Sequence, residues 1–484
     1  MTKFYLTCAF TIVSAAAFAQ FATPGNGTSY TFATLASTEG SGVTASSDNT
    51  FLLSSDITVA EGDKLSIGAG EHILFADGVT LTVDGEAIFT PDAKAYIAPA
   101  NDGARPRGMI LAGKANLRNL DIQGGGIMYN GTDPLLVENC DFSNINSVLS
   151  AYGAIVLNCT ASGNRIAHCT FTDCEPGAIN TPANMGVELD IDSNTITNVS
   201  TLNAMRPFIN ITACADHTVT VRNNTLNGAK LSAPGGIGVS NMLNTPGENK
   251  VVIENNTVTN CSWGLNFVGG MDVRIINNVV KDNCWDPDDN GGIGATLYSI
   301  DSLPMTVYAE GNTFEGNKWG PIVMGGTTAN FGKTEDPTAD DYNPGKNIFR
   351  GNKHTDASGN EILCDFCNNT KTTVYAQGNY WNDATTEEEV AKTIMDSNYS
   401  SAYGPVIYTP FEIYTGIGEV KDETATSFDG TTLRSSQATV ITVYDLAGRL
   451  ILTTGTPAHS LDVSHLPGGV YIATAGSSSI KFVR

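Results

Sequence analysis

The chain has 484 residues, with 26 lysines and arginines against 50 aspartates and glutamates, and its formal net charge is −24. This acidic balance excludes nucleic-acid binding, which selects basic surfaces. It also opposes unassisted binding of an acidic polysaccharide unless a metal ion bridges the two. The length leaves room for more than one domain.

Residues 1–19 have the features of a signal peptide. Lys3 precedes an apolar stretch from Phe4 to Phe18, and Ala17-Phe18-Ala19 fits the small-x-small cleavage pattern. No later segment is long and apolar enough to span a membrane. We therefore expect an exported protein without a transmembrane span.

Residues 20–115 alternate apolar and polar residues, as in Val79-Thr-Leu81-Thr-Val83, but they lack the repeat that follows. Such alternation has the period of a β-strand. We interpret this region as an N-terminal cap and irregular first coils of a repeat array, because the ends of such arrays need covers.

Residues 116–411 carry a repeat centred on a pair of residues that is usually Asn-Asn. The second member of the pair, here called position zero, recurs every 22–35 residues, and a large apolar residue follows two places later. The zero positions are Cys140, Cys169, Asn194, Asn224, Asn256, Asn278, Asn312, Asn347 and Asn379. A fixed skeleton at this interval is typical of solenoids and other repeat arrays.

The spacing within each repeat favours strands over helices, as in Val219-Thr-Val221. Asparagine tolerates the left-handed backbone conformation, so the paired residues predict a repeated sharp bend. Stacked side-chain amides at that position would hydrogen-bond from coil to coil. The repeat resembles that of carbohydrate-binding and sugar-hydrolase domains in the pectate-lyase-like superfold. This resemblance implies an all-β, right-handed parallel β-helix of about nine or more coils, but the fold does not fix an activity.

Ten cysteines occur in the sequence, and only Cys8 lies in the signal peptide. Export permits disulfides, but the spacings leave the pairing of the other cysteines open. Cys140 and Cys169 share position zero, which favours small buried thiols stacked in the core. Cys364-Asp-Phe-Cys367 is either a local disulfide or half of a metal site.

We predict a candidate site on the strands that precede the pairs, at the outward positions two and four places before position zero. The candidate residues are Asp190, Asp192, Arg222, Glu254, Arg274 and Glu310. Since neighbouring strands lie about 4.8 Å apart, Arg222 is expected between Asp192 and Glu254. Carboxylates beside an arginine resemble pectate-lyase sites. That resemblance implies calcium bridging an acidic sugar to the carboxylates, with Arg222 or Arg274 removing a proton. Arginine is a poor base, however, and the alternative is an exposed ladder of ion pairs.

Trp263, Trp285 and Trp319 each lie seven places after a zero position, on three consecutive repeats. This spacing predicts a column of rings on which sugar rings stack. The alternative is an internal stack that fills a corner of the core.

The segment from Asp286 to Gly291 reads D-P-D-D-N-G and matches the start of a calcium loop. Asp286, Asp288 and Asn290 would supply oxygen ligands to Ca²⁺. Leu297 stands where such loops place a bidentate glutamate, so the sequence predicts a weak calcium site, with a plain acidic turn as the alternative.

A helix is predicted between Asp383 and Asn398, where Thr386 and Glu389 fit a capping box. Residues 412–437 are polar and rich in threonine and serine, which is typical of a linker.

Residues 438–484 predict short strands of a small antiparallel β-sandwich. The turn from Asp445 to Arg449, the block from Leu466 to Ile472 and the basic end resemble the C-terminal sorting domain of type IX secretion cargo. The resemblance implies passage through the type IX machinery across the outer membrane, followed by release or surface attachment. An immunoglobulin-like binding module is the alternative.

Two functional hypotheses follow. The first is an exported, noncatalytic β-helix protein at the cell surface or outside the cell that binds polysaccharide. The second is a calcium-assisted lyase acting on uronic-acid polysaccharides, or a glycoside hydrolase. The first is favoured because no catalytic set, such as H-E-x-x-H or G-x-S-x-G, is complete in the sequence.

Overall fold

The computed structural model describes residues 20–47, 49–147, 149, 152–182, 186–212, 216–241, 247–356, 358–413, 426–428, 430–445, 449–475 and 478–483. The chain forms two compact units, Met1–Ile413 and Tyr414–Arg484. The predicted signal peptide and half of the predicted linker lie outside the described residues. None of the helices in the described part of the chain has the length and apolar character needed to cross a membrane.

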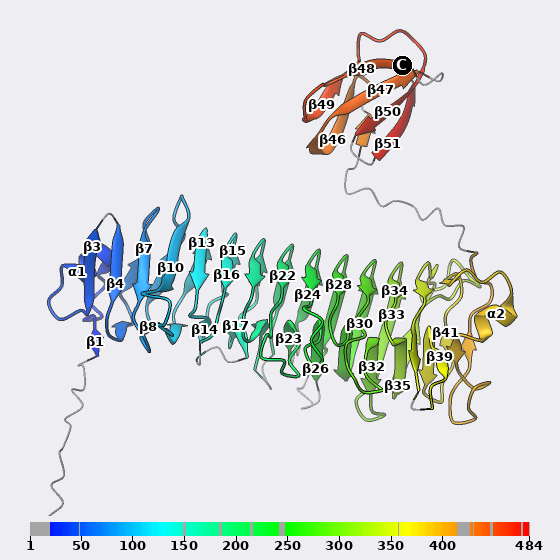
Figure 1. Cartoon of the computed structure of the whole chain (residues 1–484), viewed down its shortest axis with the longest axis horizontal. Coiled ribbons are helices and arrows are strands. Elements are labelled where there is room, and N and C mark those ends of the chain that lie inside the picture. The colour runs from blue at the N-terminus through cyan, green and yellow to red at the C-terminus, as the bar shows by residue number, and fades with distance from the viewer. Residues whose placement is uncertain are drawn as a thin grey trace, which may run out of the picture. The chain divides into compact units, whose positions relative to one another are not determined.

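The first unit is a parallel β-helix built from three 14-stranded sheets, which we call sheets A, B and C (Figure 1). The chain passes through one strand of each sheet in turn and then returns to the first sheet one coil further along. All neighbouring strands in these sheets run parallel except β3 and β4, which pair antiparallel. The predicted all-β solenoid is therefore confirmed.

Sheet A consists of β1 (Phe21–Ala22), β5 (Ile57–Val59), β8 (Thr80–Val83), β11 (Gly108–Leu111), β14 (Ile127–Tyr129), β17 (Gly153–Leu157), β20 (Gly177–Asn180), β23 (Ile209–Ile211), β26 (Ile237–Asn241), β29 (Leu265–Gly269), β32 (Ile293–Ser299), β35 (Trp319–Gly325), β40 (Phe366–Asn369) and β43 (Ile394–Met395). Sheet B consists of β2 (Ser29–Thr31), β6 (Lys64–Ser66), β9 (Glu86–Phe89), β12 (Ala115–Arg118), β15 (Leu136–Glu138), β18 (Asn164–Ala167), β21 (Leu189–Asp192), β24 (Thr218–Arg222), β27 (Lys250–Glu254), β30 (Met271–Ile276), β33 (Met305–Glu310), β36 (Thr327–Asn330), β41 (Val374–Tyr375) and β44 (Val406–Ile407). Sheet C consists of β3 (Val43–Ser47), β4 (Thr50–Leu53), β7 (His72–Phe75), β10 (Ala95–Pro99), β13 (Leu120–Gln123), β16 (Asp141–Ser143), β19 (Thr170–Thr172), β22 (Thr195–Thr197), β25 (Thr225–Asn227), β28 (Thr257–Thr259), β31 (Val279–Lys281), β34 (Thr313–Glu315), β37 (Ile348–Arg350) and β42 (Tyr380–Trp381).

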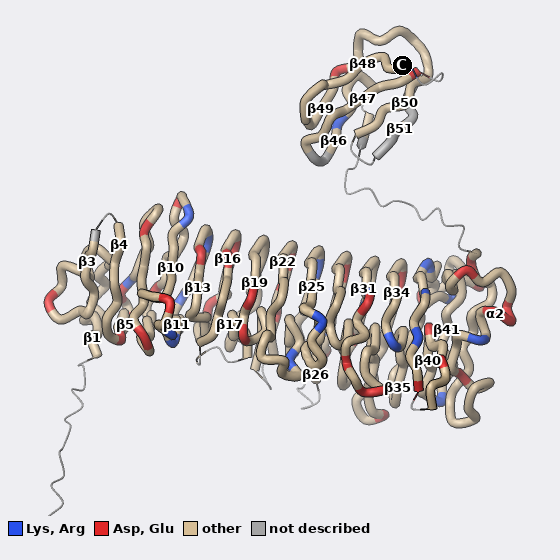
Figure 2. Tube along the Cα trace, in the orientation of Figure 1, with Lys and Arg blue, Asp and Glu red and all other residues tan. Residues whose placement is uncertain are grey.

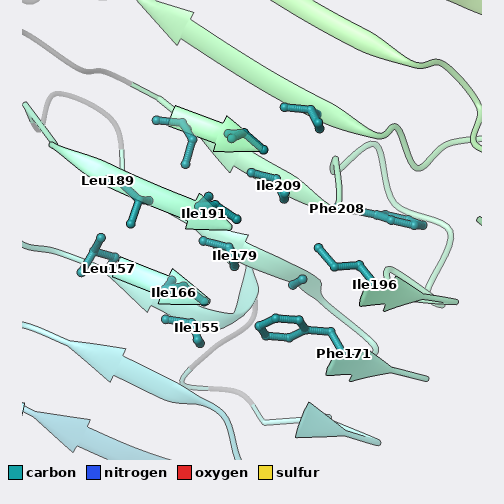
Figure 3. Close-up of a cluster of buried hydrophobic side chains, with 14 of the residues drawn as sticks. Ile155, Leu157, Ile166, Phe171, Ile179, Leu189, Ile191, Ile196, Phe208 and Ile209 are labelled. Atoms are coloured by element: carbon teal, nitrogen blue, oxygen red, sulfur yellow. The ribbon is translucent and has the colours of Figure 1, made fainter. Parts of the chain in front are cut away.

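Alternate residues of each strand point into the coil and stack on their counterparts in the next coil. Figure 3 shows Ile155, Ile179 and Ile209 of sheet A stacked in this way, with Phe171 and Ile196 of sheet C completing the interior. All five side chains are fully buried. Since burying one large apolar side chain contributes about 1.5–3 kcal/mol, the columns supply most of the stabilisation and fix the faces of every strand.

The asparagines at position zero form one buried column of hydrogen bonds. The side-chain Nδ2 of Asn224 donates to Oδ1 of Asn256 at 2.9 Å, and the backbone N–H of Asn224 donates to the same oxygen at 3.0 Å. Nδ2 of Asn224 also donates to the backbone oxygen of Ile191 at 2.9 Å. The same pattern joins Asn194, Asn224, Asn256, Asn278, Asn312, Asn347 and Asn379. We call this column the asparagine ladder.

The residue before position zero makes the sharp bend. Asn223, Asn255 and Asn277 have φ angles of 57°, 54° and 54°, in the left-handed region. One position was expected to supply both the bend and the stacked amides, but these two roles fall to the two residues of the pair. The first residue turns the backbone and leaves its side chain at the surface, while the second buries its amide.

Residues 20–115, predicted to form a cap and irregular first coils, contribute strands to all three sheets. Ile57, Leu81 and Met109 are register neighbours in sheet A. In most of these coils a longer turn joins the strand of sheet B to the strand of sheet C. At Asn119 the bend is a single residue, but the buried residue that follows it is Leu120 and not a second asparagine. The Asn-Asn pair is therefore missing although the strands stay in register.

Only short elements close the ends of the β-helix. Helix α1 (Phe32–Ala36) buries Phe32 and Leu35 near the N-terminal end. Helix α2 (Glu387–Ala391) has the predicted capping box between Thr386 and Glu389, but it is shorter than predicted. Ile394 belongs instead to β43, where it is the register neighbour of Phe366. A hairpin of β38 (Lys353–Thr355) and β39 (Glu361–Leu363) projects from the last coils.

The second unit is an antiparallel sandwich of a three-stranded and a four-stranded sheet. The first sheet contains β45 (Thr426–Phe428), β46 (Thr432–Thr439) and β49 (Ala458–Asp462), and the second contains β48 (Leu450–Thr453), β47 (Ile441–Asp445), β50 (Val470–Ala475) and β51 (Ser478–Val483). Leu433 of β46 is fully buried in its core. The predicted start at residue 438 is therefore too late, because β45 and β46 belong to the fold and not to a linker.

The described cysteines are all free thiols. They are Cys140, Cys159, Cys169, Cys174, Cys261, Cys284, Cys364 and Cys367. Burial raises the pKa of Cys174 and of Cys261 to about 12. These thiols therefore stay protonated and pack as small apolar side chains.

We expect Asn256→Ala to lower the free energy of unfolding by about 2–4 kcal/mol, because it leaves several buried donors and acceptors of the ladder without partners. Urea unfolding followed by circular dichroism measures the loss. Thr257→Ala is the control, since that side chain points outward from sheet C, and it should change the free energy by less than about 0.5 kcal/mol. Equal stability of the two variants would contradict a stabilising role for the ladder.

Candidate functional site

The outward face of sheet B contains the predicted columns of polar residues. Arg222 is the register neighbour of Asp192 on one side and of Glu254 on the other, as the repeat predicts. The outward column four places before position zero runs through Asp190, Thr220, Val252, Arg274 and Tyr308. It continues through Asn330, which register alone places there, to Tyr375. Matching positions in the sequence are thus vertical neighbours on this face.

A groove of about 600 Å³ lies along the second half of this face, over β24, β27, β30, β33, β36 and β41. We call it the sheet B groove. One row of lining residues consists of Thr218, Lys250, Asp272, Thr306, Thr328 and Thr373, and the other of Val252, Arg274, Tyr308, Asn330 and Tyr375. Lys333, Asp340 and Asp341 line it from a loop that follows β36. The groove therefore combines aromatic rings, hydroxyl groups and charged groups.

Two tyrosines of the groove have cations over their rings. The guanidinium carbon of Arg274 lies 4.4 Å from the ring centroid of Tyr308, and Nζ of Lys333 lies 4.9 Å from that of Tyr375. The hydroxyl of Tyr308 donates to Glu310 at 2.7 Å. Burial and this hydrogen bond raise the pKa of Tyr308 to about 12, so the phenol stays neutral. The rings are therefore held in place as fixed apolar surfaces.

The loop beside the groove is closed on itself and tied to sheet B. Lys333 and Asn343 exchange backbone hydrogen bonds of 2.8 and 3.0 Å. Nδ2 of Asn330 donates to the backbone oxygen of Asp341 at 2.7 Å, and Lys333 forms an ion pair with Asp341 at 2.5 Å. These contacts hold the loop as a wall of the groove.

The predicted Arg222 site lies nearer the N-terminal end of the same face and is a closed cluster of ion pairs. Arg222 contacts Asp190 at 2.9 Å and Asp192 at 3.3 Å. Arg165, one coil before Asp190, contacts the same two carboxylates, at 3.0 Å for Asp192. Because both arginines are held by the same aspartates, the guanidinium of Arg222 is fixed as a cation. Proton abstraction by Arg222 or Arg274 stays a prediction.

The environment of Asp192 favours its charged form. Burial alone would raise its pKa, but hydrogen bonds from Asn223, Ser193 and Arg165 act in the opposite direction. Together with the charge of Arg222, they lower the pKa from 3.8 to about 2. The carboxylate of Asp192 thus stabilises the fold at every pH at which it is ionised.

Sequence reasoning missed Arg165, Tyr308 and Tyr375 as site residues, although each lies four places before a zero position. Arg165 precedes Cys169, so the series that started from Asn pairs began one coil too late. The signal that could have identified Tyr308 is its outward position, two residues before the candidate Glu310. Lys333 and Asp341 lie in an insertion, to which the repeat assigns no position.

The three tryptophans do not form one column. Trp319 is the register neighbour of Ile293 in sheet A. The N–H of Gly264, beside Trp263, donates to the backbone oxygen of Ile293 at 2.9 Å. Trp263 and Trp319 are thus two coils apart with Ile293 between them. Trp285 lies earlier, because the acidic loop inserted before β32 displaces it from the common position.

Each tryptophan has a separate environment. Lys230 Nζ lies 5.0 Å from the ring of Trp285, which is 39% exposed. Trp319 stacks on His354 at 4.3 Å between centroids, and its Nε1 donates to the backbone oxygen of Asp289 at 2.8 Å. Glycan contact by single tryptophans stays a prediction, but a continuous ladder of three rings is wrong.

The predicted calcium loop uses its own carboxylates to close its turns. Asp286 Oδ1 accepts from the N–H of Asp288, and Asp288 Oδ1 accepts from that of Asn290, both at 2.9 Å. Lys318 donates to the backbone oxygen of Asp288 at 3.0 Å. Among the described residues, no group of three or more histidines, cysteines or acidic residues is arranged to hold a metal. Calcium binding by Asp286, Asp288 and Asn290 stays a prediction.

Comparison with known families matches two parts of the chain. Residues 109–280 match the family described as the right handed beta helix region, and residues 426–484 match the secretion system C-terminal sorting domain. Neither a curated protein nor a solved structure matches the chain. The protein thus combines a right-handed parallel β-helix with a sorting domain. Through this domain it is cargo of type IX secretion, exported to the cell surface or the extracellular space.

Asp192→Asn should lower the free energy of unfolding at pH 7 by about 1–2 kcal/mol, because it removes the charge that both arginines bind. The pKa of Asp192 is depressed in the folded state, so its contribution is complete above pH 4 and lost as the pH falls towards 2. Urea unfolding of both proteins between these pH values measures the difference, which should shrink with acid. Asp272→Asn, at an exposed position of the same sheet, is the control, and a pH-independent difference for Asp192→Asn would contradict the assignment.

Proposed function

We propose that the protein is an exported β-helix that binds polysaccharide along the sheet B groove at the cell surface or outside the cell. The observation that carries this proposal is the pair of fixed tyrosine rings, Tyr308 and Tyr375, in a groove that hydroxyl, amide, apolar and charged side chains also line. A sugar ring has an apolar face and a hydroxyl-rich edge, so it packs on an aromatic ring while its edge forms hydrogen bonds.

The partners of the groove residues favour binding over cleavage. Arg274 stacks on Tyr308, and arginine remains protonated at any physiological pH, so it is a poor base for a lyase. The hydroxyl of Tyr308 donates a hydrogen bond to Glu310, and Asp341 is paired with Lys333. These groups are engaged in holding the shape of the groove, which suits a binding surface.

Tyr308→Ala and Tyr375→Ala should each weaken polysaccharide binding about tenfold, equivalent to about 1.4 kcal/mol, because each removes one stacking surface. Affinity electrophoresis against a panel of neutral and acidic polysaccharides, followed by calorimetry with the best ligand, measures this loss.

Tyr152→Ala is a matched control. Tyr152 also has an arginine over its ring, with the guanidinium carbon of Arg206 at 4.4 Å, but it precedes β17 of sheet A and does not line the groove. We expect this variant to bind like the original protein. Equal binding by all three variants, or no binding to any polysaccharide by the unaltered protein, would refute the proposal.

A further inference from the structure

We propose that the sheet B groove takes a linear, uncharged glycan, and that about five sugar units lie along the axis of the β-helix. This inference rests on the proposed function and adds the class of ligand. It follows from the charges of the groove, from the spacing of its uncharged groups, and from its length.

The charges that line the groove cancel. Its cations are Lys250, Arg274 and Lys333, and its anions are Asp272, Asp340 and Asp341. Two of the cations form ion pairs with carboxylates, Lys250 with Glu248 at 3.0 Å and Lys333 with Asp341 at 2.5 Å. The third, Arg274, lies over Tyr308. An anionic sugar would therefore have to displace existing partners.

The rest of the protein also disfavours an anionic polymer. The chain carries a formal net charge of −24, and Figure 2 shows acidic residues along the whole β-helix. A polyanion approaching this surface at low ionic strength is repelled. An uncharged glycan meets no such barrier.

Uncharged polar groups line the groove at four of its six strands, β24, β33, β36 and β41. Thr306 and Thr328 are register neighbours in β33 and β36, and Thr218 and Thr373 lie at the two ends of the same row. Asn330 lies between Tyr308 and Tyr375 in the second row. Each hydroxyl or amide both donates and accepts hydrogen bonds, which matches the hydroxyl groups of a sugar chain.

The length of the groove sets the length of the ligand. Six neighbouring strands of sheet B, from β24 to β41, line it. At about 4.8 Å per strand they span roughly 24 Å, and an extended chain of six-membered sugar rings advances by about one strand spacing per ring. About five rings therefore fit along the axis.

The distance between the two tyrosines along the groove also bears on the kind of glycan. Tyr308 and Tyr375 are separated by one intervening strand, β36, which places them roughly 9.6 Å apart along the axis. They therefore contact alternate sugar rings. In a chain with a two-unit repeat, such as a β-1,4-linked glycan, alternate rings turn the same face to the protein.

The test uses matched polymers and the full chain. Neutral β-1,4-linked glucan, mannan and galactan are each compared with the same polymer after oxidation of the C6 hydroxymethyl groups to carboxylates. Affinities are measured at about 50 mM and about 500 mM NaCl, since only charge-dependent binding changes between them. Oligosaccharides of two to six units of the best polymer give the length dependence.

We expect at least one neutral polymer to bind, its oxidised form to bind at least tenfold more weakly at low salt, and the neutral affinity to change less than twofold with salt. The affinity should rise up to about five units and then level off. Tighter, salt-sensitive binding of an oxidised polymer, or full affinity already at two units, would overturn this inference while leaving polysaccharide binding intact. No binding of any polymer would overturn both.

Asp341→Asn gives an independent arm of the test. It removes the carboxylate that neutralises Lys333, so the ratio of oxidised to neutral affinity should rise at least threefold at low salt. Asp289→Asn, an exposed acidic residue in the loop before β32, is the control and should leave the ratio unchanged. An unchanged ratio in Asp341→Asn would contradict the role assigned to the Lys333–Asp341 pair.

Discussion

The asparagine ladder is the constraint on which the rest of the β-helix depends. From Asn224 onward, each amide oxygen of the ladder accepts two hydrogen bonds from the preceding coil, and each ladder amide nitrogen also donates to a backbone oxygen of an earlier coil. A buried polar group without a partner costs about 1–3 kcal/mol, so a shift of one coil relative to the next is opposed at every step. The apolar columns favour burial in general, while the ladder selects one register.

Because the register is fixed, residues that are far apart in the sequence become neighbours on one surface of the β-helix. Residues four places before successive zero positions become vertical neighbours, which brings Arg165 beside Asp190 and places Tyr308 two strands from Tyr375. In the first half of this face, Arg165 and Arg222 form ion pairs with the same two aspartates. The second half remains open and forms the sheet B groove. One repeat therefore generates both a stabilising cluster and a candidate binding surface.

The repeat allowed the solenoid and its outward columns to be predicted from sequence, because a recurring skeleton fixes which residues are neighbours. The sorting domain was predicted from its own C-terminal motifs. Prediction failed where the period is interrupted. The first coils lack the Asn pair and looked irregular, and the loop before β32 moved Trp285 out of line with Trp263 and Trp319. The groove needed the structure, since its wall comes from the inserted loop with Lys333 and Asp341. A second buried ladder, Asn283–Asn317–Asn352, also escaped notice although its members lie five places after position zero.

The most direct measurement of the central claim is hydrogen exchange of the backbone amides in two ladder variants, Asn312→Ala and Asn194→Ala. Both side chains are fully buried, but Asn312 follows β33 of the groove, whereas Asn194 follows β21 in the ion-pair half. If each ladder amide holds its own coils in register, exchange will rise in β30, β33 and β36 for the first variant and in β18, β21 and β24 for the second. Unchanged exchange near both sites, or the same increase throughout the β-helix, would contradict the account.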